Sequence, residues 1–144
     1  MKKWFLFCVL VAVYLLTACA DEEKNPLPYV RVNFSIGIYM DINLMNGYPT
    51  KVPGHGYQGN GVIIVPPRFS NEGYKAFDAT CTRNINEETR SVNVNPGEAF
   101  TATCLHSKCG TVYHLLYDGY DQTNSFHLQR YKAYESNGRV FVTN

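Results

Sequence analysis

Three cysteines and one histidine in the C-terminal half of the chain are the residues best suited to metal or redox chemistry. They are Cys81, Cys104, His106 and Cys109. If the segment up to His106 is a strand, Cys104 and His106 lie on the same face of it, because side chains alternate along a strand. Three thiolates and one imidazole form a ligand set for zinc or for an iron–sulfur cluster. The spacing is not that of a standard zinc finger.

The same residue types also permit a simpler structural role. The chain has five cysteines, and Cys8 and Cys19 lie in or next to an N-terminal apolar segment. In an oxidising compartment the other three form at most one intramolecular disulfide, which leaves one free thiol. On residue types alone, one disulfide with a buried cysteine is favoured over a metal site, and both alternatives stay open.

The elements that must position these residues are expected to be short strands. Residues 29–38 alternate apolar and polar side chains, and residues 62–65 are a β-branched run that ends at two prolines. Asn137-Gly138 predicts a hairpin between the last two strands. The other expected strands are 74–77, 92–94, 99–104, 111–116, 126–134 and 139–142, and 48–61 is expected to be a loop. Without an amphipathic helix, this pattern predicts an all-β fold, a small antiparallel sandwich or barrel.

Residues 1–18 have the composition of a targeting signal. Lys2 and Lys3 precede an apolar run, residues 4–16, that is too short to span a bilayer core of about 30 Å. The sequence Leu16-Thr17-Ala18-Cys19 resembles the lipobox of bacterial lipoproteins, in which the signal peptide is cleaved before the cysteine. The resemblance implies cleavage after residue 18 and a lipid on Cys19, which would anchor the chain to a membrane.

Residues 19–28 are expected to form a lipidated acidic tether. Asp21-Glu22-Glu23 resembles the acidic export signal of some Gram-negative surface lipoproteins, and a solvated acidic linker explains it equally well. In either case we expect an outer-membrane lipoprotein whose domain, residues 29–144, faces the periplasm or the cell surface. Both compartments are oxidising.

The charge balance argues against a nucleic-acid partner. The chain has 13 Lys and Arg against 12 Asp and Glu. Without residues 1–18, which include Lys2 and Lys3, the balance is 11 against 12, about −1. Nucleic-acid binders depend on concentrated positive charge, so we expect none here. We also find no arrangement of residues for hydrolysis or group transfer and expect a protein that is not an enzyme.

Three segments are similar to parts of Rieske-type iron–sulfur domains. Residues 74–82 (YKAFDATCT) are similar to the first cluster-binding segment, in which Phe-Asp precedes Cys-x-His. Residues 106–115 look like the second segment, Cys-x-x-His-Gly followed by an aromatic residue. Residues 126–142 resemble the closing hairpin of the domain. The resemblance covers roughly residues 58–142 and implies a Rieske-like β domain over 29–144.

The four cluster-ligand positions depart from the Rieske pattern. Cys81 keeps the expected residue type, but Arg83 stands where the first histidine is expected. His106 occupies the position of the second cysteine, and Cys109 that of the second histidine. A guanidinium has no lone pair for a metal ion. The usual site of two cysteines and two histidines therefore cannot form.

The resemblance leaves two outcomes for this site. In the favoured one no cofactor binds, and a disulfide joins Cys81 to Cys109 across the two loops, closing about 27 residues and contributing about 3 kcal/mol. We then expect a membrane-anchored, non-enzymatic accessory or interaction module with a decayed cluster site and a partner protein still to be identified. In the alternative, Cys104 replaces the lost ligand. Cys81, Cys104, His106 and Cys109 then bind a [2Fe–2S] cluster for electron transfer, or a structural zinc ion.

Overall fold

The computed structural model of the chain describes residues 27–83, 91–97 and 99–144. These residues are nearly all β, with 39% of them in strands and 9% in helices, which confirms the all-β prediction. The expected signal peptide, the lipidation site Cys19 and most of the tether lie outside the described residues. Within these ranges no helix has both the length and the apolar character that a membrane crossing requires.

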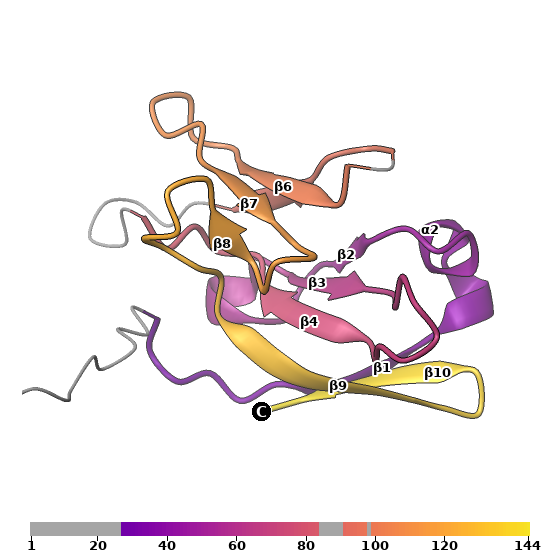
Figure 1. The fold of residues 1–144 in the computed structure, drawn as a ribbon. Coiled ribbons are helices and arrows are strands. Elements are labelled where there is room, and N and C mark those ends of the chain that lie inside the picture. Colours follow the sequence, from indigo (N-terminus) through magenta and orange to yellow (C-terminus); the bar gives the residue numbers. More distant parts are fainter. Residues whose placement is uncertain (1–26, 84–90, 98) are drawn as a thin grey trace, which may run out of the picture.

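The larger of two antiparallel sheets has six strands and curls into a half-barrel (Figure 1). The order across it is β1 (Asn33–Gly37), β10 (Arg139–Thr143), β9 (Arg130–Ser136), β4 (Lys75–Asp78), β3 (Val62–Val65) and β2 (Thr50–Val52). The two ends of the described chain pair directly, with Phe34 opposite Val142 and Ile36 opposite Val140. The hairpin between β9 and β10 turns at Asn137-Gly138, as the sequence predicted.

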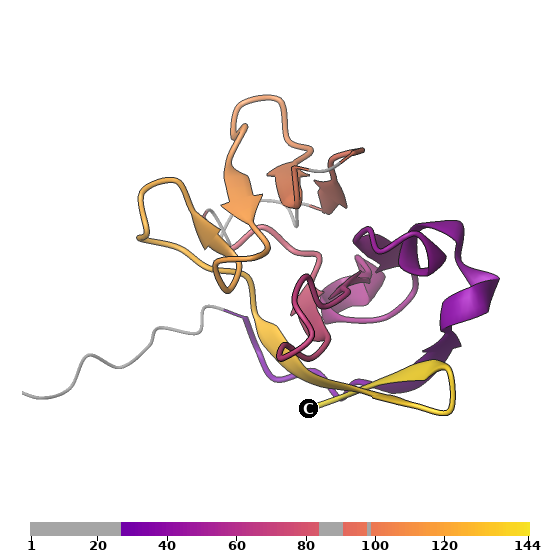
Figure 2. The same cartoon turned by 45° about the vertical axis from the view of Figure 1, so that its right-hand side comes forward.

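The smaller sheet has four strands and packs on the face of β3 and β4 that points away from the hollow of the half-barrel (Figure 2). In order, its strands are β5 (Val92–Val94), β6 (Thr101–Cys104), β7 (Val112–His114) and β8 (Tyr120–Asp121). Thr80, which follows β4, and Ser91, which precedes β5, form an isolated antiparallel bridge between the two sheets. The helical elements are single turns, namely η1 (Ile38–Met40), α2 (Ile42–Met45) and η2 (Tyr57–Gly59).

β3 is buried on both faces because it separates two hydrophobic clusters. Ile63 and Val65 pack with residues of both sheets, whereas Val62 and Ile64 pack into the hollow of the half-barrel. All four side chains are almost completely excluded from solvent. A strand covered on both sides requires a continuous apolar run instead of alternation, and this explains the four β-branched residues in a row.

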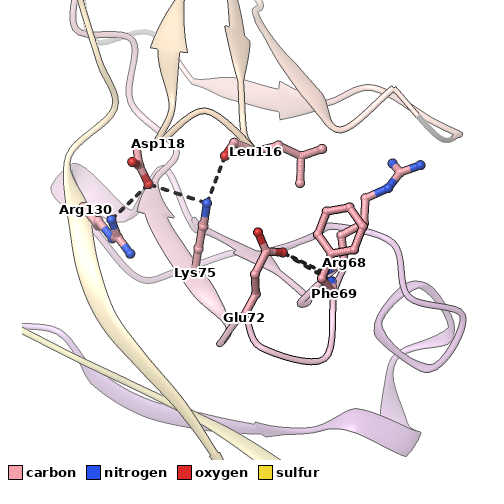
Figure 3. Close-up of polar contacts among 7 residues, drawn as sticks. All are labelled: Arg68, Phe69, Glu72, Lys75, Leu116, Asp118 and Arg130. Carbon is pink, nitrogen blue, oxygen red and sulfur yellow. Dashed lines mark hydrogen bonds and ion pairs between the residues drawn. The ribbon is translucent and has the colours of Figure 1, made fainter.

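Polar side chains fasten the turn between β7 and β8 onto the larger sheet (Figure 3). The Lys75 ammonium on β4 donates a hydrogen bond of 2.9 Å to the backbone carbonyl of Leu116 and lies 3.6 Å from the Asp118 carboxylate. Asp118 also pairs with Arg130 on β9 at 3.0 Å. The second pair is half exposed, so it contributes only about 0–1 kcal/mol. The largely buried Lys75 is the stronger link between the two sheets.

Several element boundaries differ from the sequence-based expectation. The strand expected over residues 29–38 spans only Asn33–Gly37, since the chain turns there into η1 and α2, whose N-terminus is capped by Asp41. The loop expected over 48–61 contains β2, because pairing with β3 outweighs the local glycine and proline signals. The two-residue strand β8 was not expected at all. It has no periodicity of its own and exists through its pairing with β7.

Candidate functional site

The structure brings three of the four expected ligand residues together. The Sγ atoms of Cys81, Cys104 and Cys109 all lie within 4.8 Å of one another, and we call this group the three-cysteine site. The Sγ atoms of Cys81 and Cys109 are 3.6 Å apart. All three side chains are free thiols. They come from different segments: Cys81 follows β4, Cys104 ends β6, and Cys109 lies in the loop that leads to β7.

The loop between β6 and β7 folds back so that Cys109 lies close to Cys104. Cys104 donates its backbone N–H to the carbonyl of Thr111, which closes the base of the loop at 2.9 Å. The N–H groups of Cys109 and Gly110 both donate to the carbonyl of His106. Gly110 has a φ of 57°, a conformation that costs glycine little and other residues more. The glycine after Cys109 therefore lets the chain reverse directly into β7.

A buried tyrosine, Tyr113, contacts the site from inside the protein. Tyr113 on β7 is fully buried, and its hydroxyl lies 3.3 Å from the Sγ of Cys81. The same hydroxyl accepts a hydrogen bond of 3.1 Å from the backbone N–H of Thr82. The Thr82 side chain in turn donates to the carbonyl of His127 at 2.8 Å. This network fixes the segment that carries Cys81 against the smaller sheet.

The three thiols differ in burial, and Cys104 and Cys109 differ sharply in acidity. Cys81 and Cys104 are 2% and 3% exposed, whereas Cys109 is partly open to solvent. Burial is the main cause that raises the pKa of Cys104 to about 12. Burial also opposes ionisation of Cys109, but hydrogen bonds from Thr111 and from the two neighbouring thiols outweigh it and lower the pKa of Cys109 to about 7. At neutral pH, Cys109 therefore ionises more readily than Cys104.

Arg83 supports Cys109 through Thr111. The Arg83 guanidinium donates to the Thr111 hydroxyl oxygen at 3.4 Å and lies 6.0 Å from the centre of the Phe126 ring. The Thr111 hydroxyl lies 3.2 Å from the Sγ of Cys109. Because that oxygen accepts from Arg83, its proton is free to point to the sulfur. A residue that cannot bind metal thus occupies the expected histidine position and brings positive charge close to a thiol.

His106 is not part of the three-cysteine site as the structure describes it. Its ring nitrogens do not lie within 4.8 Å of all three sulfur atoms. Its Nδ1 accepts a hydrogen bond of 3.2 Å from the backbone N–H of Lys108. Among the described residues, no other histidine or carboxylate joins the three sulfurs.

Sequence reasoning missed Thr111 and Tyr113 as neighbours of the cysteines. The signal was present in the strand expected over residues 111–116. Alternation along a strand places Thr111, Tyr113 and Leu115 on one face, and all three are buried. Two of them touch sulfur atoms of the site.

A second buried polar group is Asp78, the last residue of β4. Asp78 is fully buried, and its Oδ2 accepts hydrogen bonds from the Tyr131 hydroxyl at 2.7 Å and from the Tyr57 N–H at 2.6 Å. A Cβ on Gly56 would approach this oxygen to 2.6 Å. Within the described part of the chain, Oδ1 of Asp78 has no partner. These contacts fasten the glycine-rich segment to the larger sheet and bring no further chemical group to the carboxylate.

A surface hollow of about 390 Å³ lies between the α2–β2 segment and the start of the smaller sheet. Lys51 forms part of its wall, and burial lowers the pKa of this lysine. Its ammonium already donates to Ser91, to the carbonyl of Val92 and to Asn93. Lys51 therefore ties β2 to β5 and has no hydrogen-bond donor left for a ligand.

The geometry of the three sulfurs suits two kinds of chemistry. Cys81 and Cys109 need only a small shift to form a disulfide bond, whose S–S length is about 2.05 Å. A tetrahedral metal ion with Zn–S bonds of about 2.3 Å would hold its sulfur ligands about 3.8 Å apart, which also fits the group.

Comparison of the chain with models of protein families, with curated proteins and with solved structures gave no match. The Rieske-like assignment thus stays a prediction based on three sequence segments.

Proposed function

We propose that this chain is a membrane-anchored, non-enzymatic accessory module in which a disulfide clasp between Cys81 and Cys109 stands where Rieske domains hold a cluster. The observation that carries the proposal is the 3.6 Å separation of these two sulfur atoms, which come from the two loops expected to bind the cluster. The clasp joins the end of β4 to the start of β7 and so fastens the two sheets together at the site.

The residues around the sulfurs favour a clasp over a Rieske-type cluster. Such a cluster needs four ligands, and the described residues bring three sulfurs and no imidazole within mutual reach. Arg83, at the expected position of a histidine ligand, instead donates to Thr111. In an oxidising compartment two adjacent thiols are expected to be oxidised.

The surface supports the interaction role. The η1 and α2 turns expose four large apolar side chains within one short segment, namely Tyr39, Met40, Ile42 and Met45. Exposed apolar groups in such density are typical of protein interaction surfaces, and methionine adapts readily to different partners. The described chain starts at the end of the molecule away from α2 (Figures 1 and 2). If Cys19 carries a lipid, this apolar segment would then face away from the anchor and toward other proteins.

The mass of the intact protein tests the proposal. We would purify residues 20–144, which include every described contact, without reductant or chelator. The expected denatured mass is two hydrogen atoms below that of the reduced chain, and the expected native mass carries nothing extra. A native mass that includes iron and sulfide, both lost on denaturation, would contradict the proposal.

The mutual approach of three sulfur atoms favours one second candidate, a metal-bound site. With Cys81, Cys104 and Cys109 as ligands and His106 rotated toward them, the site would hold zinc or a [2Fe–2S] cluster for electron transfer. A brown protein would point to the cluster. For zinc, a chelator is expected to lower the melting temperature, because metal binding contributes directly to folding free energy.

A further inference from the structure

The three thiols of the site are unequally accessible from outside the protein. Cys81 and Cys104 belong to the hydrophobic core between the sheets and are almost fully buried. Only Cys109 is partly exposed, in the loop between β6 and β7. A disulfide on another molecule can therefore reach Cys109 and neither of its neighbours.

We propose that the three-cysteine site exchanges disulfides with partner proteins, Cys109 being the attacking thiol and Cys81 the resolving thiol. This inference rests on the proposed function in one respect, that the sulfurs are not occupied by a metal ion. It adds that the clasp is reversible and that its state depends on the partner.

The surroundings of Cys109 fit this role. The Thr111 hydroxyl lies 3.2 Å from its Sγ and also accepts from the positively charged Arg83. A hydrogen-bond donor and nearby positive charge stabilise a thiolate, which is the attacking form of cysteine. The Sγ of the buried Cys81 lies 3.6 Å from the Sγ of Cys109.

The reaction takes place in two balanced steps. The Cys109 thiolate attacks one sulfur of the partner's disulfide, forming a mixed disulfide and releasing the other partner sulfur as a thiolate. Cys81 then loses its proton to solvent and attacks the Sγ of Cys109. The Cys81–Cys109 bond forms, and the second partner sulfur leaves. Two electrons pass from the pair of cysteines to the partner, whose two thiolates take up two protons. Cys104 stays reduced throughout.

The rim of the site indicates what kind of partner it accepts. Arg83 and Lys108 are exposed beside Cys109, and Leu105 in the same loop is 59% exposed. Positive charge next to an apolar side chain favours a disulfide flanked by acidic and apolar residues. The partner class is therefore a protein with a disulfide in an acidic surface segment.

The test begins with the residues 20–144 protein, fully reduced and shown by native mass to carry no metal. This control separates the two hypotheses, since bound iron or zinc would contradict the proposed function before exchange is examined. Glutathione disulfide, whose carboxylates mimic an acidic partner, is then added, and aliquots are quenched with acid. Mass analysis of proteolytic fragments shows which cysteine reacted first.

We expect glutathione on Cys109 first, followed by the Cys81–Cys109 disulfide. Folded Cys109 should react at least about tenfold faster than the other two cysteines, a preference lost in denaturant. Cys81→Ser should accumulate the mixed disulfide, and Cys109→Ser should lose the reaction. Cationic cystamine should react more slowly than glutathione disulfide. First labelling of Cys81 or Cys104, or an unchanged reaction in Cys109→Ser, would overturn the proposal. The wild-type fragment analysis decides the question even if a variant does not fold.

Discussion

Replacing Thr111 with valine tests whether its hydroxyl activates Cys109. Valine keeps the shape of threonine and removes the hydroxyl that lies 3.2 Å from the Sγ of Cys109. The bonds from Thr111 are the first of the interactions that lower the pKa of Cys109 to about 7, against burial, which raises it. Without the hydroxyl we expect this pKa to rise toward 9.

The size of the effect follows from two opposing terms. At pH 7 a thiol with a pKa of about 7 is half ionised, and one with a pKa of about 9 is about 1% ionised, a loss of about fiftyfold. A more basic thiolate is a better nucleophile, so the rate constant of the thiolate form rises about six- to tenfold for this change in pKa. The net rate of Cys109 alkylation at pH 7 should therefore fall about five- to eightfold.

The assay is the rate of iodoacetamide alkylation of Cys109, followed by fragment mass between pH 5.5 and 10. The wild-type rate should rise with pH to a midpoint near 7, because the lowered pKa places ionisation there. The Thr111→Val midpoint should lie about one pH unit or more higher, and Thr111→Ser should restore the wild-type profile. A wild-type midpoint above pH 8.5, or equal profiles for wild type and Thr111→Val, would refute the reasoning.

Three further predictions concern stability, measured by urea or thermal unfolding. Oxidation of the Cys81–Cys109 pair should stabilise the fold by about 3 kcal/mol, so reductant should lower the melting temperature of wild type and of Cys104→Ser but not of Cys81→Ser; equal melting with and without reductant would contradict the clasp. Tyr113→Phe should cost about 1–3 kcal/mol, because the buried N–H of Thr82 loses its acceptor; an unchanged unfolding midpoint would show that the bond is dispensable. Phe77→Ala should cost about 3–5 kcal/mol, since this fully buried ring fills the space between the sheets; a cost below 1 kcal/mol would mean that the core closes over the gap.

The strands whose patterns are strongest could be predicted from the sequence. The β-branched run at 62–65 coincides with β3, and Asn137-Gly138 forms the turn between β9 and β10. Both signals are local, since β-branched side chains favour extended backbone and Asn-Gly favours a tight turn. β2 and β8 escaped prediction because their strand character comes from pairing with a neighbour.

The candidate site could be predicted only in part. Residue type singled out Cys81, Cys104 and Cys109 as groups capable of chemistry, and the structure places their sulfur atoms together. It does not place His106 with them, because the tight loop turns its Nδ1 toward the backbone of Lys108. Such a choice depends on loop geometry that residue spacing does not encode.

The sequence by itself determined the strand periodicity, the main hairpin and the set of reactive residue types, because each depends on neighbours along the chain. Only the tertiary structure decided which thiols meet and how readily Cys104 and Cys109 ionise. Cys81 and Cys109 are 28 positions apart, and their sulfurs approach because β4 and β7 belong to two sheets packed on one core. The partly exposed Cys109 and the buried Cys104 differ in pKa because burial and hydrogen bonding are properties of the packed molecule.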